Sequence, residues 1–172
     1  MAFPAHIVVR QADYADVDTL VEFSAAMAQE TEGRRLDRDR LRKGTLAVLD
    51  APERGFFIVA EVLDRDRSRL AGQLMVTFEW SDWRNGVFLW VQSVYVDRAW
   101  RRQGVYRAMH AAIVARATAD PQVCGVRLYV ERNNQEAQTV YQRVGLAPSG
   151  YVVYEQDFVL PKAIDRPDKA DS

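Results

Sequence analysis

The sequence predicts a mixed α/β fold, with a single mixed, mostly antiparallel β-sheet that carries helices on both faces. Apolar residues alternate as in strands or recur at helical spacing, in the order β-α-α-β-β-β-α-β-α-β. Short turns join the middle strands, and such turns require antiparallel pairing. A strand–helix–strand unit over residues 87–130 requires one parallel pair.

The chain has 172 residues, which fits one domain, and we assign residues 1–160 to it. Residues 161–172 are polar with two prolines and are expected to be a disordered tail. A net charge of −1 argues against a protein whose main task is to coat nucleic acid. The sequence shows neither a signal-peptide pattern nor an apolar stretch of about 18 residues, so we expect a cytoplasmic protein without a membrane segment.

The first strand and helix have clear local signals. His6–Gln11 is β-branched and predicts a strand. Apolar residues at helical spacing predict a helix over 17–28, which either Asp13 or Asp16 can cap. The polar residues Gln29–Leu36 are expected to form a loop.

The middle of the chain predicts a second helix and three strands. Asp37 can cap a helix that reaches Leu49. The three strands follow, and the Asn85-Gly86 pair before the last one is a strong hairpin signal. Their expected bounds are Gly55–Leu63, Leu70–Trp80 and Val87–Val96, separated by the turns 64–69 and 81–86.

The last third of the chain alternates helices and strands. Val105–Ala119 predicts a helix and Val126–Val130 a strand. Asn133 or Asn134 can cap the next helix, and Gly145 stands at its end. Tyr151–Leu160 is expected to form a last strand.

The stretch Arg101–Tyr106 (RRQGVY) joins a buried strand to a helix start and favours an anion site. Free backbone N–H groups and the helix dipole bind negative charge at such a terminus, and Gly104 allows close approach to the backbone. Arg101 and Arg102 add positive charge. A plain basic turn remains the alternative, because neither G-x-x-x-x-G-K-[S/T] nor G-x-G-x-x-G is present.

The adjacent polar residues Gln92 and Ser93 interrupt an otherwise apolar strand. A regular strand would place them on opposite faces, so at least one would be buried. A β-bulge explains the interruption, and a solvated patch on one face explains it equally well.

Two segments together resemble the GNAT superfamily of acyl-CoA-dependent N-acyltransferases. The stretch VQSVYVDRAWRRQGVYRAMH resembles the acyl-CoA motif [Q/R]-x-x-G-x-[G/A], with Arg101 and Gly104 in its first and fourth positions. The stretch LYVERNNQEAQTVYQRVGL resembles the motif N-x-x-A-x-x-x-Y-x-x-x-G-[F/L], matched at Asn134, Ala137, Tyr141, Gly145 and Leu146. Tyr106 departs from the family, which usually has Gly or Ala there, so either its ring must turn away or the cofactor must sit slightly differently.

The resemblance implies the GNAT fold and an N-acetyltransferase that uses acetyl-CoA as co-substrate and no metal. The acceptor would be the primary amine of a small molecule, attacking the thioester directly in a ternary complex. Tyr141 would donate to the departing thiolate, and a backbone N–H near Val94 would stabilise the oxyanion. The implied cofactor-binding residues are Val94, Tyr95, Val96, Arg101, Arg102, Gln103, Gly104, Val105, Tyr106, Arg107, Asn134 and Tyr141.

The acceptor side is less determined by the sequence. Glu79 is the candidate general base, and an exposed carboxylate at a strand end is the alternative for it. The candidate acceptor-binding residues are Glu30, Glu32, Trp80, Asp82, Gln92 and Ser93.

Other activities stay open at this point. Acetylation of a protein or peptide amine and a non-catalytic acyl-CoA sensor are the alternatives, and a homodimer is one possible assembly. Nucleic-acid binding is disfavoured, because acidic residues interrupt the basic run over residues 34–43.

Overall fold

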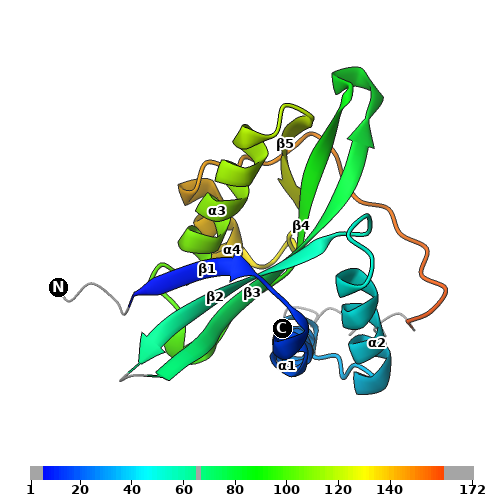
Figure 1. Ribbon diagram of the computed structural model, residues 1–172. Helices are drawn as coiled ribbons and strands as arrows, with labels where there is room; N and C mark the ends of the chain where they lie inside the picture. Colours follow the sequence, from blue (N-terminus) through cyan, green and yellow to red (C-terminus); the bar gives the residue numbers. More distant parts are fainter. Residues whose placement is uncertain (1–5, 65–66, 161–172) are drawn as a thin grey trace, which may run out of the picture.

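The computed structural model describes residues 6–64 and 67–160, which form a five-stranded sheet with four α-helices (Figure 1). The strands lie in the sheet in chain order, β1-β2-β3-β4-β5. Their bounds are β1 Ile7–Gln11, β2 Phe56–Asp64, β3 Arg67–Ser81, β4 Gly86–Val96 and β5 Val123–Leu128. The helices are α1 Val17–Glu32, α2 Arg38–Leu49, α3 Val105–Ala119 and α4 Gln135–Arg143.

The sheet is mixed, as the sequence predicts. The pairs from β1 to β4 are antiparallel, and the β4–β5 pair, which α3 connects, is parallel. Figure 1 shows α3 and α4 on one side of the sheet and α1 and α2 on the other. The larger core lies between the sheet and α3, and includes the buried α3 residues Met109 and Ile113. A smaller core lies around Leu20 on the α1 side of the sheet.

Local capping signals place most helix starts correctly. The side chain of Asp37 accepts from the Arg40 N–H at the start of α2, and Asn134 accepts from the Ala137 N–H at the start of α4. Asp13 caps a short 3₁₀ turn, Tyr14–Asp16, that leads directly into α1. The helix α3 has the bounds that its apolar spacing predicts.

The structure corrects the expected loop over Gln29–Leu36. Residues 29–32 extend α1, because Gln and Glu are good helix formers and the helix finds its stop only at Gly33. Gly33 adopts the left-handed conformation (φ 63°) and its N–H donates to the Ala28 carbonyl. Glu30 and Glu32 therefore lie on a helix and not in a loop.

The structure also corrects the last strand and shifts another. Tyr151–Leu160 forms no strand, although its composition suits one, since it lies exposed and lacks the ladder partners that a strand needs. The strand β5 begins at Val123 and ends at Leu128, displaced toward the N-terminus from the expected 126–130. The tail over 161–172 lies outside the described residues, as does the tip of the β2–β3 turn at 65–66.

Within 6–64 and 67–160, no helix combines the length and the apolar character that crossing a membrane requires.

Candidate active site

A β-bulge interrupts β4 where the sequence places two adjacent polar residues. Gln73 of β3 pairs with Tyr95, but Met75 pairs with Gln92, so that Ser93 and Val94 together oppose one residue. Ser93 has a positive φ of 50°. The bulge is therefore present, and it changes the direction of the strand just before the turn to α3.

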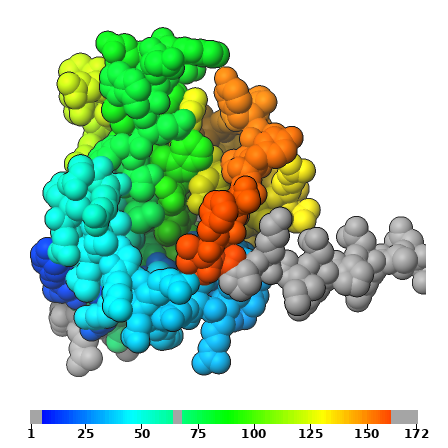
Figure 2. Space-filling view, turned by 90° about the vertical axis from the view of Figure 1, so that its right-hand side faces the viewer, coloured from blue at the N-terminus to red at the C-terminus, as the bar shows by residue number. Residues whose placement is uncertain are grey.

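Beyond this point β4 has a partner on one side only. The parallel ladder with β5 ends at Val91 and Leu128, whereas β4 continues to Val96 and stays paired with β3. Figure 2 shows a hollow in the surface between the green residues of β3 and β4 and the orange segment near the end of the described chain. Backbone groups of β4 on the β5 side are thus available to an extended ligand.

The turn after β4 presents the N-terminus of α3. Gly104 is the N-cap residue with a φ of 88°, and Arg102 is also left-handed at 61°. The first N–H groups of α3, from Val105 to Arg107, have no partner inside the helix. Within 4 Å, a Cβ on Gly104 would meet only the Arg107 guanidinium, at 3.7 Å. The turn therefore combines open space, free donors and a nearby positive charge.

Arg101 is already engaged with the protein. Its Nη2 donates to Glu30 Oε2 at 2.6 Å, and its Nε donates to the Val96 carbonyl at 3.0 Å. Glu30 Oε1 accepts further hydrogen bonds from the Tyr95 hydroxyl and from Arg98 Nε. From the sequence we expect Arg101 to supply charge at the turn and Glu30 to face the acceptor. In the structure these two residues form an ion pair with each other.

The position of the Tyr106 ring explains how the turn can hold a large residue where the motif has a small one. The ring is buried in the larger core, edge-on to Tyr141 with ring centroids 5.3 Å apart and next to His110 at 5.9 Å. Burial raises the pKa of both tyrosines and lowers the pKa of His110. Tyr141 thus stands beside the first turn of α3, and Tyr106 leaves the space at the turn open.

Glu79 lies well before the bulge along the paired strands. It pairs with Phe88 across the β3–β4 ladder, six residues before Val94 along β4, or about 20 Å at roughly 3.3 Å per residue. Both of its oxygens accept from Arg127 Nη1, at 3.0 and 3.1 Å. Its described partner is therefore Arg127, and this ion pair joins β3 to β5.

Trp80 and Asp82 also lie at the distant end of the hairpin. Trp80 pairs with Val87, and Asp82 belongs to the 3₁₀ turn that leads to β4. The two residues do not join Val94 and Tyr141. By contrast Gln92, which donates to Thr77 Oγ1 at 2.6 Å, and Ser93 lie at the bulge itself.

The structure brings Glu32, which the sequence predicts at the acceptor site, near Tyr129 and Glu155, two residues that sequence reasoning missed. The rings of Trp90 on β4 and Tyr129 after β5 lie 6.0 Å apart. Burial raises the pKa of Tyr129, and the nearby charges of Glu155 and Glu32 raise it further. No local sequence pattern could have revealed this grouping, because its members come from four distant parts of the chain.

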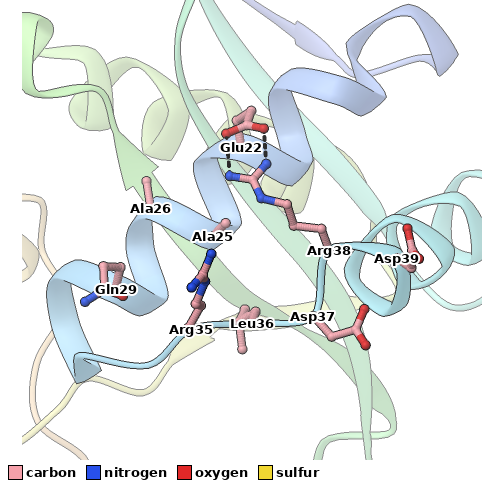
Figure 3. A pocket seen from close by; sticks show the side chains of 9 residues that line it. All are labelled: Glu22, Ala25, Ala26, Gln29, Arg35, Leu36, Asp37, Arg38 and Asp39. Carbon is pink, nitrogen blue, oxygen red and sulfur yellow. Dashed lines mark hydrogen bonds and ion pairs between the residues drawn. The ribbon is translucent and has the colours of Figure 1, made fainter.

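A separate surface pocket of about 960 Å³ lies between α1 and the segment that enters α2 (Figure 3). An ion pair between Glu22 and Arg38 closes one side of it. None of the residues predicted for the cofactor or the base lines this pocket. Its lining residues are Glu22, Ala25, Ala26, Gln29, Arg35, Leu36, Asp37, Arg38 and Asp39.

In the part of the chain that the structure describes, no group of three or more His, Cys, Asp or Glu side chains is arranged to hold a metal ion.

Comparison with known proteins identifies the class of this fold and site. The model of the acetyltransferase (GNAT) family matches residues 17–146, which is more than half of the chain. The chain therefore belongs to the GNAT acetyltransferase family. It is an acyl-CoA-dependent N-acyltransferase, and the family uses acetyl-CoA and acts on amines. A search of curated proteins gave no match.

Solved structures agree with this assignment. A possible acetyltransferase from Clostridium difficile 630 is 40% identical with a TM-score of 0.80, covering 90% of this chain and 99% of its own. A predicted acetyltransferase with acetyl-CoA from Clostridium acetobutylicum shares the fold at 15% identity and a TM-score of 0.69, covering 88% and 96%. AAC(6')-Iy, in complex with the bisubstrate analogue CoA-S-monomethyl-acetylneamine, shares it at 14% identity and 0.69, covering 89% and 99%.

Proposed function

We propose that this enzyme transfers an acetyl group from acetyl-CoA to the primary amine of a small molecule, within a ternary complex. The observation that carries the proposal is the position of the α3 N-terminus. It follows the bulged, half-paired end of β4 directly, and Tyr141 adjoins its first turn.

The residues of the turn fit the diphosphate of acetyl-CoA. Backbone N–H groups of Val105 to Arg107 can donate to the phosphates, since left-handed Gly104 keeps the approach open. Arg102 and Arg107 supply positive charge, while Arg101 is held by Glu30. The unpaired side of β4 near Val94 and Val96 can pair with the amide groups of the pantetheine arm.

The reaction needs an oxyanion donor and an acid for the leaving group. The amine nitrogen forms a bond to the thioester carbon and the C–S bond breaks. The proton that the amine loses ends, through solvent, on the leaving sulfur, so the products are the amide and the free thiol of CoA. A backbone N–H at the bulge near Val94 donates to the developing oxyanion. The Tyr141 hydroxyl donates to the departing sulfur. Because burial raises the pKa of Tyr141, we expect it to stabilise the thiolate by a hydrogen bond more than by full proton transfer.

The acceptor amine would approach from the α1 side of the sheet. Trp90 and Tyr129 form an aromatic wall there, and the carboxylates of Glu32 and Glu155 act on Tyr129. Two carboxylates that act on the Tyr129 ring favour a cationic amine. One structural neighbour, AAC(6')-Iy, holds a CoA-linked bisubstrate analogue, which supports an acceptor site next to the cofactor in this fold.

Acetyl-CoA binding and thiol release test the proposal. Calorimetric titration should show binding of acetyl-CoA, and thiol release over a panel of amines should reveal a small cationic acceptor. Tyr141→Phe should lower kcat by about tenfold to a hundredfold, the range of a hydrogen bond to a charged group, and leave the Kd for acetyl-CoA unchanged.

Three outcomes would contradict parts of the proposal. Binding of acetyl-CoA without turnover on any amine would indicate a sensor. Turnover with peptide amines alone would replace the acceptor class. An unchanged kcat in Tyr141→Phe would remove the role of that residue.

A further inference from the structure

Glu30 is the meeting point of three separate elements. It lies near the end of α1, and its Oε1 accepts from the Tyr95 hydroxyl of β4 at 3.1 Å and from Arg98 Nε at 3.0 Å. Its Oε2 accepts from Arg101 Nη2 at 2.6 Å. The Glu30 side chain is 19% exposed, whereas that of Arg101 is 41% exposed. Both oxygens of the Glu30 carboxylate are therefore in use.

The hydrogen bonds keep Glu30 charged. Burial alone would raise the pKa of Glu30, but the hydrogen bonds from Arg101, Tyr95 and Arg98 outweigh it and lower that pKa. Three of the roughly four acceptor positions of the Glu30 carboxylate are already occupied, so little capacity is left for an acceptor amine. The geometry thus favours a role inside the protein over a role in acceptor recognition.

The contact with Arg101 bears directly on the backbone of the turn. Arg101 also donates to the Val96 carbonyl and lies over the Tyr95 ring, 5.6 Å from its centroid, so its side chain is held between α1 and β4. The next residue, Arg102, has a φ of 61°, and Gly104 follows at 88°. Gly104 adopts this conformation freely, but Arg102 is a non-glycine residue in the left-handed region, and such a residue persists only where the surrounding structure holds it. Arg101 holds the turn at one end, and the first turn of α3 holds it at the other.

We propose that Glu30 is a positioning residue, which fixes the turn 101–104 through Arg101 and so sets the affinity for the diphosphate of acetyl-CoA. The inference rests on the proposed function, which assigns the diphosphate to this turn. It replaces the expectation that Glu30 binds the acceptor.

The variant Glu30→Gln tests this, because it keeps the size of the side chain and removes its charge. The Kd for acetyl-CoA and for free CoA should rise about threefold to thirtyfold, as expected for loss of a charge-assisted hydrogen bond with a partly exposed partner. The KM for the amine should stay unchanged. Glu22→Gln is the matched control on the same helix: its partner Arg38 belongs to α2, and both constants should stay at wild-type values.

A double-mutant cycle separates positioning from simple charge removal. Arg101→Met should weaken acetyl-CoA binding to a similar degree, and Glu30→Gln added to it should have little further effect. Because the Arg101 side chain is partly exposed, we expect Arg101→Met to fold, and it removes the same ion pair. It therefore tests the contact even if Glu30→Gln folds poorly.

Each contrary outcome has a distinct meaning. Tighter binding in Glu30→Gln would show that Glu30 only repels the phosphates, and this would overturn the inference. A raised amine KM with an unchanged Kd would also overturn it, in favour of an acceptor role. Wild-type protein that failed to bind acetyl-CoA would overturn the proposed function itself, and the inference with it.

Discussion

Gly72 of β3 lies where the sheet meets the start of α3, and replacing it with alanine tests how closely they must pack. A Cβ at this position would lie 2.9 Å from the Tyr95 carbonyl oxygen, 3.1 Å from Val105 Cγ1 and 3.2 Å from Met109 Cε. Val105 and Met109 are 2% and 0% exposed, so neither has free space to move into. Backbone or helix must therefore shift by a few tenths of an ångström.

The cost of this shift can be estimated from overpacked cores. Such insertions destabilise by about 1–3 kcal/mol. For a domain of this size each kcal/mol lowers Tm by about 2–4 °C, so Gly72→Ala should lower it by roughly 2–12 °C. Because Val105 opens α3, the same shift moves a backbone N–H proposed to bind the diphosphate, and the Kd for acetyl-CoA should rise severalfold.

The same substitution elsewhere should have the opposite effect. Gly44 is exposed within α2, and a Cβ there would meet nothing within 4 Å. Gly44→Ala should stabilise the protein by about 1 kcal/mol through helix propensity and leave acetyl-CoA binding unchanged. Thermal unfolding and calorimetric titration of the two variants provide the comparison. A Gly72→Ala protein as stable as Gly44→Ala, with wild-type affinity, would refute the packing argument.

Three further predictions concern the turn, the pH dependence and the base. Gly104→Ala should weaken acetyl-CoA binding and cost about 1–2 kcal/mol of stability, measured by urea unfolding, because alanine is strained at a φ of 88°. Asp16→Asn should lower the free energy of unfolding by about 2 kcal/mol at pH 7, because it removes a carboxylate that accepts hydrogen bonds from Arg10. These hydrogen bonds lower the pKa of Asp16, so their contribution is present above pH 4 and is lost as the pH falls through the folded-state pKa. The difference in stability between variant and wild type should therefore shrink in urea titrations near pH 3. Glu79→Gln should leave the pH profile of kcat unchanged, because Glu79 is paired with Arg127 far from Val94 along the strands. Loss of the acidic limb of that profile would restore Glu79 as the base.

Local signals explain what could be predicted from the sequence. The bounds of α3 and the Asn134 cap of α4 depend on residues within one or two turns of each other. The parallel β4–β5 pair follows from the helix between the strands. The polar pair Gln92–Ser93 suggested either a bulge or a solvated patch, and the structure shows the bulge.

Long-range contacts explain what could not. Glu30 meets Arg98 and Arg101 across 68 and 71 residues of chain, and no local pattern encodes such a pairing. Glu79 looked like a base near a strand end, but its distance from the bulge depends on the register of β3 against β4. For Tyr151–Leu160, composition suited a strand, whereas strand formation depends on a partner that composition cannot supply.

Tyr106 shows which property of the turn the chemistry requires. A small residue is usual there in the motif that the sequence resembles, yet the ring points into the core against Tyr141 and His110 and leaves the helix terminus open. The cost is a buried hydroxyl for which the described residues provide no hydrogen-bond partner. At Gly104, by contrast, there is space for a side chain, but the left-handed backbone disfavours any residue other than glycine. The proposed diphosphate site therefore depends on backbone conformation at Gly104, and bulk at position 106 is tolerated because the anion would be bound by N–H groups, which every residue except proline supplies.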